Sequence, residues 1–344
     1  MALNRREFLL GLPLGAGAVW ACQSTGMGPR GGGRYVELAR TKPEAASGKS
    51  ILAFMPETEQ TRQVWTGLAD ELGKSFELVA VRIDGKDSAS TIARGIAQHR
   101  PAGIVLMNNP TVSAYRSYQR GAQGNAFPPA VIVMSSFLEG QRNRPVAATG
   151  ISYEVPLITV VTNLRKLIAS RIDRVGVIQR EPLTGFVNRQ AALAQLEQTA
   201  VVRETVSRDP NASEIKRALR RLKQEVDAIW VLNDDRLLSP RLIADGWLPG
   251  LNERPFRPTI VGAASLVSPG HSFGTFAVLP DHTALGAQAA SLMFDIADND
   301  WAVPSAEDTQ LPLSTTTTVD LPQVLERFSL RDGALTQVDR ILER

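Results

Sequence analysis

Hydrophobic and polar positions beyond about residue 50 follow two alternating patterns. Short apolar runs such as 51–55 and 103–107 are separated by longer segments, such as 58–74, in which apolar residues recur every three or four positions. The first pattern predicts strands buried on both faces, and the second predicts amphipathic helices. Strands that alternate with helices in this way are typical of parallel sheets with crossover helices.

The alternation occurs twice along the chain. Predicted strands of the first half are 51–55, 76–83, 103–107, 130–134 and 148–153, with helices at 58–74, 88–98 and 112–121. Predicted strands of the second half are 174–178, 201–207, 228–232, 259–262 and 275–279, with helices at 157–170, 184–198, 213–224 and 283–297 and a helical segment near 240–244. We therefore predict an α/β fold of two doubly wound, Rossmann-like lobes with parallel sheets and an interlobe cleft. The lobes are expected at 50–154 and 155–320, and a C-terminal helical tail at 321–344 is expected to pack back on them.

The first 22 residues carry the pattern of an export signal. Arg5 and Arg6 precede an uncharged apolar run, 8–21, that is well below the roughly 20 residues needed to span a bilayer. The arginine pair resembles a twin-arginine signal. The residues Val19-Trp20-Ala21-Cys22 resemble a lipobox, in which the cysteine is diacylated and becomes the new N-terminus.

Cys22 is therefore predicted to be a lipidation site that follows a signal peptide at 1–21. The protein is expected on the periplasmic face of a membrane, and Gln23 after the cysteine favours the outer membrane. A soluble exported protein cut near Ala21 and an uncleaved anchor are the alternatives. The Gly-, Pro- and Ser-rich segment 22–49 predicts a flexible tether.

Composition narrows the function classes. The chain has 344 residues with 38 Lys+Arg against 35 Asp+Glu, and this charge of +3 is too weak to indicate nucleic-acid binding. A single cysteine excludes an intramolecular disulfide framework and a zinc site built from several thiolates.

Polar residues follow most of the predicted strands. In open α/β sheets, ligands bind beyond the carboxyl ends of the strands. Several of these residues are also ordinary helix caps and turn formers, which is the alternative interpretation of each one. As a set, they predict a polar cleft.

Four segments of the chain form a recognisable series: Gly150-Ile151-Ser152-Tyr153-Glu154 with its following helix, Arg174-Val175-Gly176-Val177-Ile178, Trp230-Val231-Leu232-Asn233-Asp234 and Phe276-Ala277-Val278-Leu279-Pro280-Asp281. In their order and spacing, over about 50–325, the chain resembles the ABC-transporter substrate-binding proteins of periplasmic binding type I. Such proteins are two hinged lobes that close on a small ligand. The resemblance implies these ligand-facing residues: Glu57, Thr58, Asn108, Ser135, Ser136, Tyr153, Thr184, Asn233, Asp234 and Asp281.

The resemblance also implies roles and partners. For an α-amino acid, the ammonium is expected on Asp234 or Asp281, and Tyr153 is expected to stack on the ligand at the crossover between lobes. The expected function is lipid-anchored solute binding for an ABC-type importer, with a membrane permease as partner. The basic loop 138–145 and the twin-arginine leader favour the alternative, a non-transport lipoprotein that acts as a sensor or as an accessory of a membrane protein.

Catalysis, cofactors and metals are not expected. Gly270-His271-Ser272-Phe273-Gly274 matches a nucleophile-elbow pattern, but a turn precedes the serine and a strand follows it, so the motif predicts a connection between strands. His99, His271 and His282 have no metal-ligand spacing and are interpreted as surface or cap residues.

Overall fold

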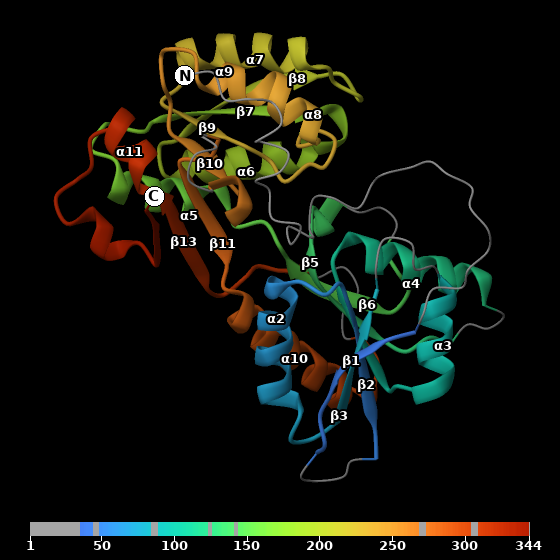
Figure 1. Cartoon of the computed structure of the whole chain (residues 1–344). Helices are drawn as coiled ribbons and strands as arrows, with labels where there is room; N and C mark the ends of the chain where they lie inside the picture. The colour runs from blue at the N-terminus through green and yellow to red at the C-terminus, as the bar shows by residue number, and fades with distance from the viewer. Residues whose placement is uncertain are drawn as a thin grey trace. The chain divides into compact units, whose positions relative to one another are not determined.

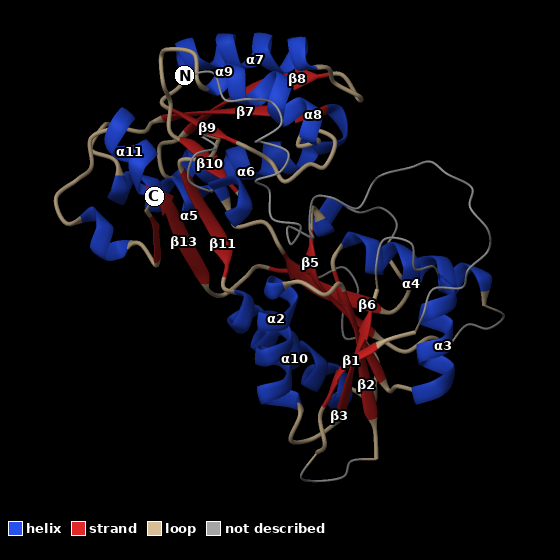
Figure 2. Cartoon of the chain, in the orientation of Figure 1, coloured by secondary structure: helices blue, strands red, loops and turns tan. Residues whose placement is uncertain are grey.

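The computed structural model describes residues 35–43, 48–83, 89–122, 126–140, 144–267, 273–303 and 309–343. The chain divides into two compact units (Figure 1). The N unit comprises 35–153 and Pro280–Ser314, and the C unit comprises Glu154–Leu279 and 315–343. Each unit contains a seven-stranded sheet flanked by helices (Figure 2).

The sheet of the N unit has the order β1-β3-β2-β4-β5-β6-β12. Its strands are β1 (Glu37–Arg40), β2 (Ser50–Met55), β3 (Glu77–Arg82), β4 (Gly103–Met107), β5 (Ala130–Ser135), β6 (Ala148–Ser152) and β12 (Thr309–Gln310). All neighbours pair in parallel except β1, which is antiparallel to β3. Helices α2 (Glu59–Leu72) and α10 (His282–Asp298) cover one face, and α3 (Ala89–His99) and α4 (Asn109–Gly121) cover the other.

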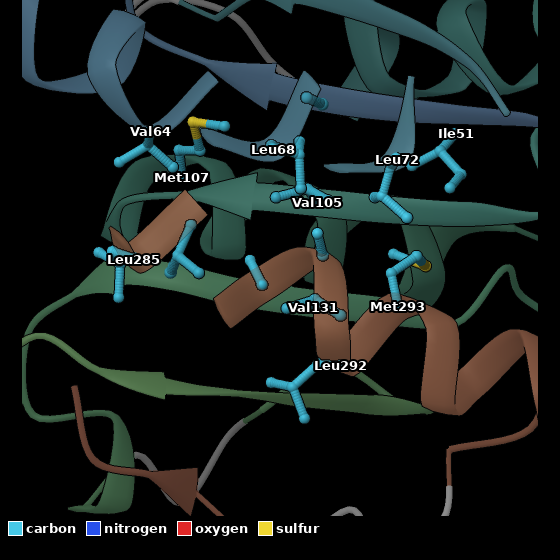
Figure 3. Close-up of a cluster of buried hydrophobic side chains, with 14 of the residues drawn as sticks. Ile51, Val64, Leu68, Leu72, Val105, Met107, Val131, Leu285, Leu292 and Met293 are labelled. Atoms are coloured by element: carbon cyan, nitrogen blue, oxygen red, sulfur yellow. The ribbon is translucent and has the colours of Figure 1, made fainter. Parts of the chain in front are cut away.

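The buried strands are continuously apolar because successive side chains point to opposite faces of the sheet and helices cover both faces. In β2, Ile51 and Met55 pack with α2 and α10, whereas Leu52 and Phe54 pack with α3 and α4. Figure 3 shows the first of these layers, in which residues of both helices lie over the sheet.

Two glycines allow α2 and α10 to pack closely. A Cβ atom at Gly67 of α2 would stand 2.0 Å from the carbonyl oxygen of Thr283, and one at Gly286 of α10 would stand 2.1 Å from the carbonyl oxygen of Val64. These distances are far below a van der Waals contact. The backbones therefore meet at positions where only glycine fits, and α10 is fixed to the N sheet although it is distant in sequence.

The sheet of the C unit has the order β14-β13-β11-β10-β9-β7-β8. Its strands are β7 (Arg174–Arg180), β8 (Ala200–Val206), β9 (Ala228–Trp230), β10 (Thr259–Val261), β11 (Phe276–Pro280), β13 (Thr315–Asp320) and β14 (Arg340–Leu342). The helices are α5 (Leu157–Leu167), α6 (Thr184–Leu196), α7 (Ala212–Glu225), α8 (Pro240–Leu242), α9 (Leu248–Leu251) and α11 (Leu321–Arg327). Ile215, Leu219 and Leu222 of α7 pack on one face, and Phe186 of α6 packs on Trp230 from the other.

The predicted α/β class with doubly wound, parallel sheets is confirmed. The units differ from the predicted lobes, because 280–314 lies in the N unit: α10 packs against α2 and not against the C sheet. The predicted tail 321–344 is not wholly helical, since β14 pairs in parallel with β13. Within the described residues, no helix is both long enough and apolar enough to cross a membrane.

The predicted tether, 22–49, also contains regular structure. Its residues Glu37–Arg40 form β1 at the edge of the N sheet, where Arg40 pairs with Glu77 at 2.6 Å. Just before the strand, the Tyr35 hydroxyl lies 2.8 Å from His99 Nε2. The chain is thus attached to the N unit about 13 residues earlier than predicted. Cys22 and the signal segment lie outside the described residues, as does His271.

Candidate functional site

Predicted ligand-facing residues of the N unit gather at one edge of the sheet. Glu57 and Thr58 follow β2, Asn108 follows β4, and Ser135 ends β5. These three strands are neighbours and run parallel, so their carboxyl ends meet at the same edge. Tyr153 follows the next strand, β6. The strand order therefore brings these segments to one edge of the sheet, and their contact with a ligand stays a prediction.

The same edge carries strained backbone. Asn108 has φ 100°, and Met134 and Phe137 each have φ 55°, in the region that L-residues with bulky side chains avoid. Such conformations cost on the order of 1–3 kcal/mol each and cluster at functional sites. Between the last two, Ser135 donates a hydrogen bond from its hydroxyl to Asn109 Oδ1. The strain lies on the adjacent ends of β4 and β5, which favours a binding role for this edge.

Several predicted residues of the N unit act as helix caps. Thr58 Oγ1 accepts from the Thr61 N–H at 3.2 Å, and Asn108 Oδ1 accepts from the Thr111 N–H at 3.0 Å. Asp281 Oδ1 accepts from the Thr283 and Ala284 N–H groups at 2.9 and 3.1 Å. Oδ1 of Asp281 therefore caps the first turn of α10, and the contact of this carboxylate with a ligand ammonium stays a prediction.

Glu57 is an exposed member of an ion-pair group. Its carboxylate lies 3.3 Å from Arg62 Nη2 and 3.6 Å from Arg82 Nη1. Arg62 Nη1 also lies 3.8 Å from Glu59, so two guanidinium groups face two carboxylates at the end of β2. The group is therefore balanced in charge and selects neither an anion nor a cation.

Tyr153 pairs with a histidine that the sequence did not mark as part of the site. Its hydroxyl lies 3.0 Å from His282 Nε2, and the two rings stack with centroids 6.0 Å apart. Burial lowers the pKa of His282, and the neighbouring Asp281 opposes this shift. His282 is the first residue of α10, so it does lie beside a cap. His99 differs from its predicted surface role, because its side chain is only 7% exposed and lies 3.1 Å from Glu37.

The C unit places an ion pair at the carboxyl ends of its central strands. Arg180 ends β7, and its Nε and Nη2 donate to the two carboxylate oxygens of Asp234 at 2.6 and 2.8 Å. The Arg236 N–H also donates to Asp234 Oδ1, at 3.0 Å. The side chain of Asp234 is 2% exposed, and its carboxylate raises the pKa of Arg180. Asp234 is thus part of a buried salt bridge, and its role toward a ligand ammonium stays a prediction.

Neutral polar side chains complete this edge. Gln179 is buried and donates from Nε2 to Thr184 Oγ1 at 3.2 Å and to Thr205 Oγ1 at 3.3 Å. Asn233 donates from Nδ2 to the Gly262 carbonyl oxygen at 3.1 Å. Gln179 and Arg180 are not among the residues predicted from sequence, because the prediction took only residues that follow β7. Their position at the carboxyl end of β7 is the feature that could have identified them.

Comparison with known proteins supports the fold. No family model matches the chain, and no curated protein matches it. Among solved structures, a ligand-free, open substrate-binding protein with adhesive properties from Clostridium difficile has a TM-score of 0.60 at 14% identity, over 86% of this chain and 99% of that one. An ABC domain in complex with L-Trp from Streptococcus pneumonia has a TM-score of 0.54 at 15% identity, over 86% of this chain and 100% of that one. The fold is periplasmic binding protein type I-like.

One further match is a conserved domain protein from Vibrio cholerae. It has a TM-score of 0.55 at 17% identity, over 86% of this chain and 99% of that one. Of the three structures, the one from Streptococcus pneumonia holds L-Trp. Since the sequences share so few residues, the similarity establishes the architecture, and the chemistry must come from this chain's own side chains.

Proposed function

We propose that the chain is an extracytoplasmic solute-binding protein without catalytic activity. It holds a small polar ligand, an amino acid or a similar molecule, at the carboxyl ends of its strands and delivers it to an ABC-type importer. The observation that carries the proposal is the strained polar edge of the N unit, where Asn108, Met134 and Phe137 have positive φ values. The similarity to a substrate-binding protein and to an L-Trp complex supports the same role.

A thermal-shift screen of the full chain, purified in detergent, tests the binding role. Amino acids, sugars and other small metabolites serve as probes. A ligand present at 100 times its dissociation constant adds about 2.7 kcal/mol of stability, which raises the melting temperature by about 4 °C in a chain of this size. No shift with any probe contradicts solute binding and favours the alternative, an accessory lipoprotein of the same fold.

The proposal places the protein on the periplasmic face, attached through lipid on Cys22, with the outer membrane favoured. Metabolic labelling with palmitate tests the attachment. Label is expected in the wild-type chain and absent from Cys22→Ser, while Ser24→Ala serves as the matched control. Equal labelling of wild type and Cys22→Ser contradicts the lipid anchor without affecting the binding role.

A further inference from the structure

Two amide side chains of the C unit, Gln179 and Asn233, donate hydrogen bonds from their nitrogens while their oxygens accept none from the described part of the chain. Nε2 of Gln179 and Nδ2 of Asn233 both donate within the unit. Gln179 Oε1 and Asn233 Oδ1 are buried and have no hydrogen-bond partner among the described residues. The two residues lie at the carboxyl ends of β7 and β9, which are adjacent strands. A buried acceptor without a partner is unfavourable, and in native proteins it calls for an explanation.

The orientation of the Asn233 amide is fixed by Gly262. Rotating the amide by half a turn would bring Oδ1 to within about 3.1 Å of the Gly262 carbonyl oxygen, where two acceptors repel. The side chain also lies directly over the glycine, because a Cβ at position 262 would stand 2.4 Å from Nδ2 and 2.7 Å from Oδ1. Gly262 thus leaves the space that the amide occupies and holds its nitrogen, so that the oxygen is the atom left to accept.

The charge beside Asn233 is already balanced. Asp234 receives two hydrogen bonds from Arg180 and one from the Arg236 N–H, so the pair presents no net charge. An ammonium placed against this buried pair would lose its hydration without gaining an unpaired carboxylate, because the next aspartate, Asp235, is exposed to solvent. A neutral N–H or O–H group loses far less hydration and gains the hydrogen bond that Asn233 Oδ1 lacks.

We propose that Asn233 is a specificity-determining residue that accepts a hydrogen bond from a neutral N–H or O–H group of the ligand, with Gly262 as its positioning residue. The inference rests on the proposed solute-binding function. It names the ligand class that the C unit selects: a molecule with a hydroxyl, carboxamide or heterocyclic N–H donor. It also means that a ligand ammonium, where one exists, is not recognised by Asp234.

Matched probe pairs test the ligand class on the full chain. Each probe that shifts the melting temperature is compared with an analogue lacking the ammonium, such as 3-indolepropionate for L-tryptophan, and with an analogue in which the neutral donor is methylated, such as 1-methyl-L-tryptophan. Methylation is expected to weaken binding about tenfold or more in wild type but not in Asn233→Ala. A methylated probe that binds wild type as tightly as its parent overturns the proposal.

Substitutions separate the roles of the two residues. Asn233→Ala and Gly262→Ala are each expected to weaken probe binding about tenfold, and the double variant no further, because both remove the same acceptor. Asn188→Ala, an exposed asparagine of α6, is the control and leaves affinity unchanged. Additive losses in the double variant contradict the positioning role of Gly262.

Stability of the ligand-free chain provides a readout that needs no ligand. Residues kept for binding are not optimised for stability, so Asn233→Ala is expected to leave the melting temperature within about 1 °C of wild type. A fall of several degrees would show that Asn233 is a structural support and would overturn the inference, whatever the probes show. An unchanged melting temperature with no shift by any probe instead contradicts the proposed function itself.

Discussion

Removal of the Asp234 carboxylate is expected to destabilise the C unit through the charge it leaves behind. In Asp234→Ala, the Arg180 guanidinium loses its 2.6 and 2.8 Å hydrogen bonds, and the Arg236 N–H loses its acceptor. The Arg180 side chain is only 14% exposed, so water cannot fully replace the lost carboxylate. The substitution therefore leaves a mostly buried cation unpaired.

Breaking a buried ion pair by removing one partner costs about 3–5 kcal/mol. Because Arg180 retains some contact with water and a bond from Nη1 to the Arg208 carbonyl oxygen at 3.3 Å, the lower end applies, about 3 kcal/mol. Replacing both partners, as in Arg180→Leu with Asp234→Leu, removes the unpaired charge. The double variant is therefore expected to recover at least about 2 kcal/mol relative to Asp234→Leu alone.

Urea denaturation of the full chain measures these free energies of unfolding. Asp235→Ala is the matched control, since this neighbouring aspartate is exposed, and a change within about 0.5 kcal/mol is expected. An Asp234→Ala variant as stable as wild type that no longer binds any probe would refute the reasoning, because it would show that the carboxylate contacts ligand and does not stabilise the fold.

Three other substitutions test the packing and electrostatics of the N unit. Gly67→Ala is expected to destabilise by about 1–3 kcal/mol in urea denaturation because its Cβ meets the α10 backbone, whereas Gly121→Ala, with open space around it, should not. Burial lowers the pKa of His282, so the unfolded chain binds a proton on this imidazole at a higher pH than the folded chain does. The stability that the neutral imidazole contributes is therefore fully present above about pH 6.5 and is lost as the pH falls through the lower folded-state pKa. His282→Gln should weaken this pH dependence of the free energy of unfolding in urea titrations between pH 7.5 and 5. Tyr115→Phe, which removes the 2.5 Å bond to the Pro128 carbonyl oxygen, should cost about 1 kcal/mol by thermal melting, and an unchanged melting temperature would contradict it.

Elements with their own periodicity were predictable from sequence, and elements that depend on a distant partner were not. The buried runs of β2 and β4 and the amphipathic helices needed only local pattern. Strand β1 has four residues and a mixed pattern, and it is held by β3 and by contacts near Tyr35. Likewise, α10 has the pattern of any helix, and its place over the N sheet depends on contacts distant in sequence, among them those at Gly67 and Gly286.

The candidate site was likewise only partly predictable from the sequence. In each unit, parallel topology fixes the sheet edge at which the polar residues lie, Asn108 and Ser135 in the N unit and Asn233 in the C unit, because strand ends can be read from sequence. The hydrogen-bond partner of each polar atom at these edges does not follow from topology. Arg180 is 54 residues from Asp234 in the sequence, and its guanidinium forms a neutral pair with the Asp234 carboxylate. The unpaired oxygen of Asn233 is visible only once its amide nitrogen is placed on Gly262. The inferred ligand chemistry in the C unit therefore depends on which hydrogen-bonding atoms the fold leaves unused, and residue type alone does not show which atoms those are.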